Sequence, residues 1–195
     1  CGNIAPMHAA GIRETDGAEL IAVSDVVEKN AVALAEKFGA KPYTDYQELL
    51  KRDDIQVVCL CVPSGMRMEI AEACAAAGKN ILSEKPLEVN TERIDRIIKA
   101  TEDAGVRLGC VFQSRFANGP VQVYKAIQQG RFGKLVLGDA YIKWYRTEEY
   151  YKSGAWRGTR KLDGGGALMN QGIHMIDLLQ WFMGPVKSVL ARTAT

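Results

Sequence analysis

The chain has 195 residues, of which 47% are hydrophobic and 25% charged, an ordinary composition for a soluble globular protein with a sizeable core. Its 25 lysines and arginines barely exceed its 23 acidic residues and are scattered, which excludes a basic stripe for nucleic acid or a membrane-surface helix. No apolar run approaches the roughly 18 residues of a membrane span, so we expect a cytoplasmic protein. Five cysteines without metal-ligand spacing and only two histidines predict reduced core thiols and no metal site.

Helical and extended patterns alternate through the first half of the chain, which is typical of βαβ units and a parallel sheet. Helices are expected where apolar residues recur at helical spacing, with Gly39 and Gly78 as C-caps and Thr44 with Gln47 as a capping box. Strands are expected where short apolar runs lie between them. The predicted order is helix 4–14, strand 20–24, helix 31–38, a short helix after Thr44, strand 57–62, helix 70–77, strand 80–83, helix 94–101 and strand 106–112.

After Phe112 the pattern changes, so we predict a first domain over 1–112 and a second over 113–195. The second part predicts a helix over 121–127, a long extended run over 135–146, one amphipathic helix over 168–183 and a strand from 186 to 195. That last strand has no sheet partner in the sequence. The chain opens on Cys1-Gly2 with no strand before it, so we expect an incomplete polypeptide that lacks the first strand of the sheet.

Gly2-Asn3-Ile4-Ala5 matches the end of a glycine-rich dinucleotide fingerprint, in which backbone amides at a helix N-terminus bind a pyrophosphate. Asp25 follows Gly2 by 23 positions at a strand end, where the fingerprint places an acid that binds the ribose hydroxyls. An acid there repels a 2′-phosphate, which favours NAD over NADP. The alternatives are a simple turn into a helix and, for Asp25, a helix N-cap.

Two more strand ends carry candidate site residues. Pro63-Ser64 follows the strand at 57–62 and could hold the cofactor's ribose and nicotinamide, although Ser64 could equally be a helix N-cap. Glu84-Lys85-Pro86 follows the next strand, and Pro86 fixes the backbone beside Lys85. Ligands of open α/β sheets bind at the carboxyl ends of strands, so Lys85 is a candidate for proton transfer or anion binding. The alternative is a surface lysine in a turn.

Asn170, His174 and Asp177 are spaced i, i+4 and i+7 and so share one face of the predicted helix. A lone histidine on such a face is usually a satisfied core residue. Three polar side chains are costly to bury together unless they meet partners or a ligand, which favours a functional site.

With these motifs the chain resembles the Gfo/Idh/MocA family of oxidoreductases over its whole length. Gly2 to Ala5 resembles the cofactor loop, Glu84-Lys85-Pro86 the family's E-K-P motif, and Gly164 to Asp177 its glycine-rich helix with histidine. Tyr150-Tyr151 and Trp156 to Thr159 resemble a further common segment.

The resemblance implies a Rossmann-like doubly wound parallel sheet followed by an α/β domain whose mostly antiparallel open sheet forms a dimer or tetramer interface. It implies hydride transfer from a secondary alcohol of a sugar, sugar acid or nucleotide sugar to NAD, with Lys85 and His174 as catalytic residues. The implied cofactor-binding residues are Gly2, Asn3, Ile4, Asp25, Pro63, Ser64, Glu84, Lys85 and Gln113. The implied substrate-binding residues are Lys85, Arg115, Tyr151, Trp156, Arg157, Asn170 and His174.

Two positions depart from the family pattern. Asn170 stands where the family usually has an aspartate four residues before the histidine, and an amide cannot take a proton, so Lys85 and His174 must share that work. This resembles the members that oxidise C3 of UDP-N-acetylglucosaminuronate. Arg67 stands where histidine is common, and with Arg115, Arg157 and Arg160 it could bind a carboxylate or diphosphate. For each arginine alone, a surface salt bridge is the simpler interpretation.

Two other functions stay open at this point. A non-catalytic nicotinamide-binding regulator is disfavoured because both Lys85 and His174 are retained. A redox-neutral glycosidase that uses bound NAD transiently would turn over without net formation of NADH.

Overall fold

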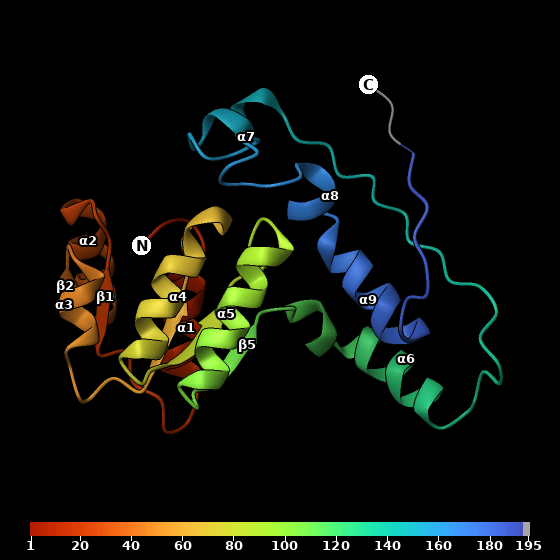
Figure 1. Cartoon of the computed structure of the whole chain (residues 1–195), viewed down its shortest axis with the longest axis horizontal. Helices are drawn as coiled ribbons and strands as arrows, with labels where there is room; N and C mark the ends of the chain where they lie inside the picture. The colour runs from red at the N-terminus through yellow and green to blue at the C-terminus, as the bar shows by residue number, and fades with distance from the viewer. Residues whose placement is uncertain (193–195) are drawn as a thin grey trace.

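The computed structural model describes residues 1–192 and has a Rossmann-like α/β first half with parallel strands (Figure 1). β1 (Ala22–Ser24) pairs with β2 (Lys41–Tyr43), while β3 (Val57–Leu60), β4 (Asn80–Ser83) and β5 (Leu108–Cys110) form a second sheet in that order. All pairs are parallel, as expected. The expected single sheet is divided, because no strand among residues 1–192 joins β1 to β3 by hydrogen bonds.

Five α-helices alternate with these strands, and their ends follow local sequence rules. They are α1 (Ala5–Glu14), α2 (Glu28–Phe38), α3 (Tyr46–Leu50), α4 (Arg67–Ala76) and α5 (Thr91–Asp103). Gly39 ends α2 at φ 76°, which confirms the predicted C-cap, since glycine adopts this left-handed conformation without steric cost. The N-cap of α3 is Asp45, whose side chain accepts from Gln47 N, and not the predicted Thr44.

The strand β2 was not expected, because Lys41-Pro42-Tyr43 lacks an apolar run. It forms because the left-handed turn at Gly39 returns the chain to β1, where Lys41 N donates to Ile21 O at 3.0 Å. A three-residue edge strand tolerates Pro42, since proline sits on the outer side of an edge without losing a ladder bond.

The main core lies between β3, β4 and the helices α4 and α5. Leu60, Cys74, Ile81 and Ile97 are among its buried members. Cys74 is completely buried, and burial raises the pKa of its thiol to about 12, as expected for a reduced core cysteine.

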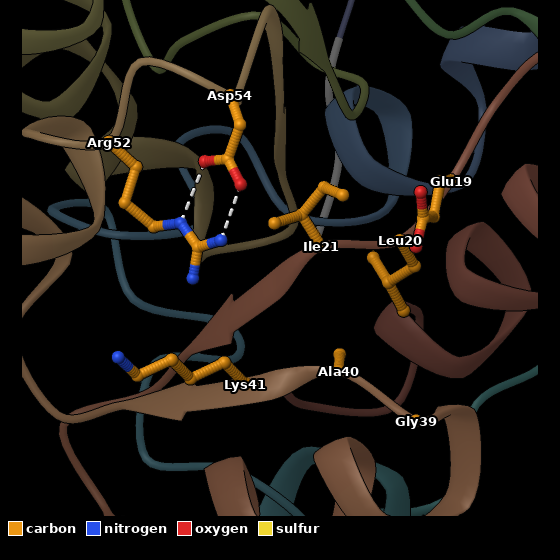
Figure 2. Close-up of a pocket in the computed structure, with 8 residues that line it drawn as sticks. All are labelled: Glu19, Leu20, Ile21, Gly39, Ala40, Lys41, Arg52 and Asp54. Carbon is orange, nitrogen blue, oxygen red and sulfur yellow. Dashed lines mark hydrogen bonds and ion pairs between the residues drawn. The ribbon is translucent and has the colours of Figure 1, made fainter.

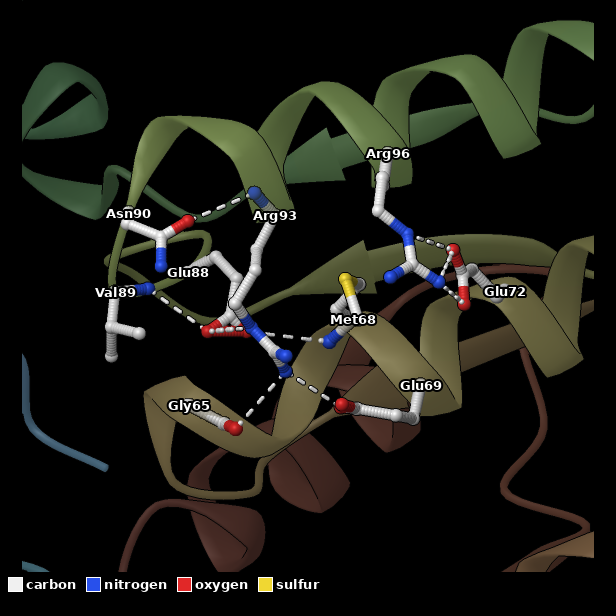
Figure 3. Close-up of polar contacts among 9 residues, drawn as sticks. All are labelled: Gly65, Met68, Glu69, Glu72, Glu88, Val89, Asn90, Arg93 and Arg96. Atoms are coloured by element: carbon white, nitrogen blue, oxygen red, sulfur yellow. Dashed lines mark hydrogen bonds and ion pairs between the residues drawn. The ribbon is translucent and has the colours of Figure 1, made fainter. Parts of the chain in front are cut away.

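Charged side chains cross between α4 and α5 above this core (Figure 3). The carboxylate of Glu88 is fully buried and accepts from Val89 N at 2.9 Å, while Arg93 Nε lies 3.2 Å away. Arg93 also binds Glu69 at 2.7 Å, and Arg96 binds Glu72 at 2.8 Å. These contacts fix the segment that follows Pro86 against α4.

The second half is helical in the described residues. It contains the 3₁₀ helix η2 (Gln113–Phe116), then α6 (Asn118–Gln128), α7 (Glu148–Lys152), α8 (Ala167–Asn170) and α9 (Ile173–Met183). A further 3₁₀ helix, η1 (Ser64–Met66), lies in the first half, between β3 and α4. In Figure 1, α6 and α9 pack side by side, and Tyr124 stacks on Trp181 with ring centroids 4.1 Å apart.

The antiparallel sheet expected in the second half is not seen among residues 113–192. The run 135–146 and the segment from 186 to 192 leave the helices without forming strands, and the end of the predicted strand, 193–195, lies outside the described residues. Apolar side chains on both runs are exposed, for example Val136 at 87% and Leu190 at 91%. Extended segments need a neighbouring strand for their backbone groups, and these described residues offer none.

The single helix expected over 168–183 is also wrong. Gln171 and Gly172 interrupt it, so Asn170 ends α8 while His174 and Asp177 lie on α9. Gly172 approaches the backbone of Leu168 so closely that a Cβ would lie 2.8 Å from Leu168 O. The three polar side chains nevertheless remain buried together on the inner side of this break, at 8–9% exposure.

Among the residues that the structure describes, no helix combines the length and the apolar character needed to cross a bilayer.

Gly65 is a point of close contact between the two halves, and a substitution there is the first prediction. Gly65 N donates to Leu162 O at 3.0 Å, and a Cβ on Gly65 would lie 2.1 Å from Lys161 O. Gly65→Ala should lower the free energy of unfolding by about 1–3 kcal/mol, because backbone must move to admit the methyl group. Thermal denaturation measures this. Gly11→Ala is the matched control: a Cβ there meets nothing within 4 Å, so helix propensity should leave stability equal or higher. Equal effects of the two substitutions would contradict the prediction.

Candidate active site

The predicted cofactor residues lie at one edge of the parallel strands. Asp25 follows β1, Pro63 and Ser64 follow β3, Glu84 and Lys85 follow β4, and Gln113 begins η2 after β5. The carboxyl ends of parallel strands point the same way, so these positions share the sheet edge where open α/β folds bind ligands. Ser64 is 2% exposed, whereas Gln113 is exposed.

The loop before α1 lies next to Asp25. Cys1 Sγ lies 3.4 Å from Ser24 O, and the Asp25 carboxylate accepts from Val27 N at 2.8 Å. A Cβ on Gly2 would meet nothing within 4 Å, so the backbone there is open to a ligand. An open glycine backbone, a helix N-terminus and an ionised acid together fit the pyrophosphate and ribose of a dinucleotide.

Lys85 is partly buried and reaches the second half of the chain. Its Nζ donates to the backbone oxygen of Asn170 at 2.7 Å and lies 3.4 Å from Asn170 Oδ1. Burial lowers the pKa of Lys85; Glu84 opposes this shift, while the nearby charge of Arg67 adds to it. A lysine with a depressed pKa at a sheet edge suits acid–base chemistry, because it gives up its proton more readily than an exposed lysine does.

Asn170 is held from its other side by Asp163. Asn170 Nδ2 donates to Asp163 Oδ1 at 2.5 Å, and Asp163 is 2% exposed. Its second oxygen accepts from Gly158 N at 2.8 Å. No role is predicted for Asp163 from the sequence, because nothing local in the sequence links it to Asn170 or Lys85.

His174 is 8% exposed, and its Nδ1 is buried with no hydrogen-bond partner among residues 1–192. Burial lowers the pKa of His174, and the positive charge of Lys85 lowers it further. His174 is therefore a neutral imidazole at pH 7. A buried ring nitrogen without a partner is costly unless a ligand satisfies it, so this atom marks a polar contact point for a bound molecule.

The pKa of His174 leads to a second prediction. Its imidazole stays neutral in the fold, whereas in the unfolded chain it takes up a proton below about pH 6.5. Acidification from pH 8 to pH 5 should therefore destabilise the protein more than it destabilises His174→Gln, whose side chain does not titrate. Thermal melting of both proteins across this range measures the difference. A melting-temperature difference that is independent of pH would contradict the lowered pKa.

Arg115 and Asp177 form a bidentate ion pair, at 2.8 and 2.6 Å, that ties η2 to α9. The Arg115 guanidinium also lies over the ring of Trp181, 5.5 Å from its centroid. Asp177, predicted on the polar face with His174, thus has a protein partner. Arg115 Nε and Nη2 both donate to Asp177, so these donors stabilise the contact between η2 and α9. The expected contact of Arg115 with substrate stays a prediction.

Arg67 is buried, so both predictions for it are wrong: it forms no surface salt bridge among residues 1–192, and its donors are used by backbone oxygens and not by a bound anion. It is 4% exposed and donates to the backbone oxygens of Val62, Glu84 and Pro86, with Nη1 2.6 Å from Glu84 O. Burial lowers its pKa. The guanidinium therefore satisfies the backbone carbonyls that follow β3 and β4, including those of Glu84 and Pro86 on either side of Lys85.

His8 makes a partly buried contact that the sequence did not predict. Its Nε2 lies 2.9 Å from Glu84 Oε1, so α1 is tied to the residue before Lys85. The thiols of Cys59 and Cys61 and the Glu84 carboxylate raise the pKa of His8, and the pair carries opposite charges near neutral pH. Helical spacing could have predicted this contact. His8 lies within one turn of Ala5 and next to Ala9, and both alanines are buried, so His8 lies near the face of α1 that packs on the sheet.

A second polar cluster centres on the hydroxyl of Tyr150. It accepts from Arg157 Nη1 at 2.7 Å and from Gln171 Nε2 at 2.8 Å. The Arg157 guanidinium is stacked between Tyr150 and Trp156, with ring centroids 4.4 and 4.6 Å from its central carbon. Tyr150 and Gln171 were not predicted as site residues, whereas the predicted Tyr151 packs edge-on against Tyr150 and is 36% exposed.

A separate cavity does not coincide with these residues. It has a volume of about 530 Å³ and lies at the opposite ends of β1 and β2, lined by Glu19, Leu20, Ile21, Lys41 and the Arg52–Asp54 ion pair (Figure 2). This cavity lies at the amino ends of β1 and β2, whereas Asp25 follows the carboxyl end of β1. In the residues that the structure describes, no group of three His, Cys, Asp or Glu residues is arranged to hold a metal ion.

Comparison with known proteins places this geometry in a family. Residues 1–112 match an oxidoreductase family with an NAD-binding Rossmann fold, and residues 121–195 match the GFO/IDH/MocA C-terminal domain. A myo-inositol 2-dehydrogenase of Thermotoga maritima is 35% identical over 68% of this chain and 40% of its own length. A D-glucoside 3-dehydrogenase of Escherichia coli is 31% identical over 96% of this chain and 53% of its own length.

A solved structure similar to this chain is the WlbA dehydrogenase from Bordetella pertussis in complex with NADH and UDP-GlcNAcA. It has 37% identity and a TM-score of 0.87, covering 95% of this chain and 55% of that one. GenD2 from gentamicin A biosynthesis, in complex with NAD, has 26% identity and a TM-score of 0.79 over 94% of this chain and 51% of that one. The chain spans about half the length of the relatives it matches. It belongs to the Gfo/Idh/MocA family of NAD-binding oxidoreductases.

Proposed function

We propose that the protein is an NAD-dependent dehydrogenase that oxidises a secondary alcohol of a sugar, sugar acid or nucleotide sugar. The observation that carries the proposal is the arrangement of Lys85 and His174: a partly buried lysine whose pKa is lowered by burial, and a histidine close enough for the charge of Lys85 to lower its pKa, whose buried Nδ1 has no partner among the described residues. One group can accept a proton and the other can bind the same hydroxyl.

NAD, when bound, accepts the hydride from the alcohol carbon. The residues that would hold it are Gly2, Asn3 and Ile4 at the start of α1, Asp25 after β1, Pro63 and Ser64 after β3, Glu84 and Lys85 after β4, and Gln113 after β5. The preference for NAD over NADP rests on Asp25, because a carboxylate at this strand end would repel a 2′-phosphate.

Lys85 Nζ takes the hydroxyl proton as the alcohol becomes a carbonyl. His174, through its unpartnered Nδ1, orients that hydroxyl, and Asn170 holds Lys85 through its backbone oxygen and binds a neighbouring substrate hydroxyl. Partial burial of Lys85 lowers the pKa of its ammonium, which makes proton transfer from it easier than from an exposed lysine.

A nucleotide sugar or sugar acid is our preferred substrate class. Asn170 in place of an acid supports it, as does the likeness to WlbA, whose structure contains UDP-GlcNAcA. Arg157, stacked between two aromatic rings with its Nε unpartnered, is suited to bind a substrate carboxylate or phosphate together with Trp156 and Tyr151. We also propose that the full-length protein is a homo-oligomer and that a domain boundary follows residue 112.

Absorbance at the NADH band, measured with the full-length protein, tests this function. Free sugars, inositols, D-glucosides and UDP-sugars, including UDP-sugar acids, should be compared with NAD and with NADP. We expect NADH formation with a UDP-sugar acid at a higher kcat/KM than with free sugars. Turnover of a glycoside without net NADH would indicate the redox-neutral alternative, and NAD binding without any turnover would indicate a regulator. A tenfold preference for NADP would overturn the role of Asp25.

A further inference from the structure

Asp163 is a buried carboxylate that the proposed mechanism does not use, and it lies one hydrogen bond from the residue that binds Lys85. Its two oxygens have one partner each: Oδ1 accepts from Asn170 Nδ2 at 2.5 Å and Oδ2 accepts from Gly158 N at 2.8 Å. Asp163 N also donates to Thr159 O at 2.9 Å, which fixes the backbone of the carboxylate. At 2% exposure, water does not replace these partners.

The chemistry of the partners fixes which way the Asn170 amide points. An ionised carboxylate only accepts hydrogen bonds, so it can face only the NH₂ group of Asn170. The amide oxygen must then point to the other side, where it lies 3.4 Å from Lys85 Nζ, in addition to the backbone oxygen of Asn170 at 2.7 Å. Lys85 thus meets two oxygens and no amide hydrogen.

We propose that Asp163 is a positioning residue of the active site: it locks the Asn170 amide so that its oxygen, and not its NH₂, faces Lys85. The inference rests on the proposed function, because it assigns Lys85 the role of proton acceptor. Asp163 itself exchanges no proton with the substrate. Asp163 contacts Asn170 on the side away from Lys85, and its carboxylate places near Lys85 a negative charge that the Asn170 amide does not carry.

Five charged or titratable groups surround Lys85. Burial lowers its pKa, Glu84 and Asp163 raise it, and Arg67 and Arg157 lower it, while His174 on α9 is neutral. Removal of the negative charge of Asp163 should therefore lower the pKa of Lys85. A carboxylate placed closer to Lys85, at position 170, should raise the pKa of Lys85.

Two isosteric substitutions separate this role from a purely structural one. In Asp163→Asn, the new amide keeps its oxygen on Gly158 N–H, because that partner only donates, and turns its NH₂ toward Asn170. Asn170 must then turn its own oxygen away from Lys85 and present NH₂ to the ammonium. In the double variant Asp163→Asn with Asn170→Asp, the amide at 163 donates to the carboxylate at 170, and that carboxylate faces Lys85. All partners are satisfied again. Asn170→Asp alone brings two carboxylates into contact.

The experiment measures kcat with the best substrate of the full-length protein and, without cofactor, the pKa of Lys85. The latter comes from the pH dependence of acetylation of Lys85 by acetic anhydride, read by mass spectrometry of the peptide. We expect Asp163→Asn to lower kcat by about 100-fold and to lower the pKa of Lys85. The double variant should recover at least about tenfold of kcat and raise that pKa above the wild-type value.

A fall in kcat for Asp163→Asn without a shift in the pKa of Lys85, and without recovery in the double variant, would make Asp163 a structural residue and overturn the inference. Unchanged kcat and pKa in the single variant would overturn it as well. If Asp163→Asn does not fold, the double variant decides alone, through the acetylation pKa of Lys85. Absence of NADH formation by the wild-type protein with every alcohol would instead count against the proposed function, since the acetylation result does not depend on turnover.

Discussion

Lys85→Met should lower kcat/KM for alcohol oxidation by about 10²- to 10⁴-fold, the range that a lost general base costs. Methionine has a similar length and an apolar end, so it suits the partly buried position but cannot accept a proton. NADH binding, measured by fluorescence titration, should weaken far less than kcat/KM falls, because Lys85 is only one of the residues expected to hold the cofactor, with Gly2 and Asp25 among the others. The loss therefore appears in the chemical step.

Lys85→Arg separates a base from a positive anchor. Arginine keeps the charge and its hydrogen bonds but does not lose its proton near neutral pH, so this variant should be as inactive as Lys85→Met. Lys99→Met is the control, since Lys99 is exposed on α5, where it forms a surface ion pair with Asp103. Activity that survives in Lys85→Met, or is restored in Lys85→Arg, would remove Lys85 from the role of proton acceptor.

Arg67→Met should lower the free energy of unfolding by about 3–5 kcal/mol, the usual cost of removing one partner from a buried charged contact. The substitution leaves the buried carbonyls of Val62, Glu84 and Pro86 without their donor. Urea denaturation of the full-length protein measures the loss. Arg67→Lys should recover only part of it, because a single ammonium cannot span all three oxygens as the planar guanidinium does.

Arg96→Met is the matched control for Arg67→Met. Arg96 lies on the neighbouring helix α5 and pairs with Glu72, but it is largely exposed, so its loss should cost at most about 1 kcal/mol. Equal destabilisation by both substitutions would show that the carbonyl contacts of Arg67 contribute little. Because Glu84 O and Pro86 O flank Lys85, the folded fraction of Arg67→Met should also have reduced activity.

The sequence predicted those parts of the fold that depend on neighbouring residues. Helix spacing and Gly39 defined α2, and the apolar runs defined β3, β4 and β5 within a few residues. Lys85 was recognisable because a strand, a turn and a proline are adjacent in the chain. Elements that need a distant partner were predicted less well: β2 forms only through pairing with β1, and the extended runs of the second half form no strand in the described residues.

The candidate site divides in the same way. The residue types, the order of the motifs and their position after strands were determined by the sequence, and so were the Gfo/Idh/MocA resemblance and the choice of Lys85, His174 and Asn170. Only the tertiary structure decided what each of these touches. Lys85 and Asn170 are 85 residues apart, and His8 and Glu84 are 76 apart. Arg67 resembled a surface cation in the sequence, and Asp163 had no visible partner. The reason is physical: a polar side chain acquires its role from the few atoms that replace its water on burial, and those atoms come from segments that only the folded chain brings together.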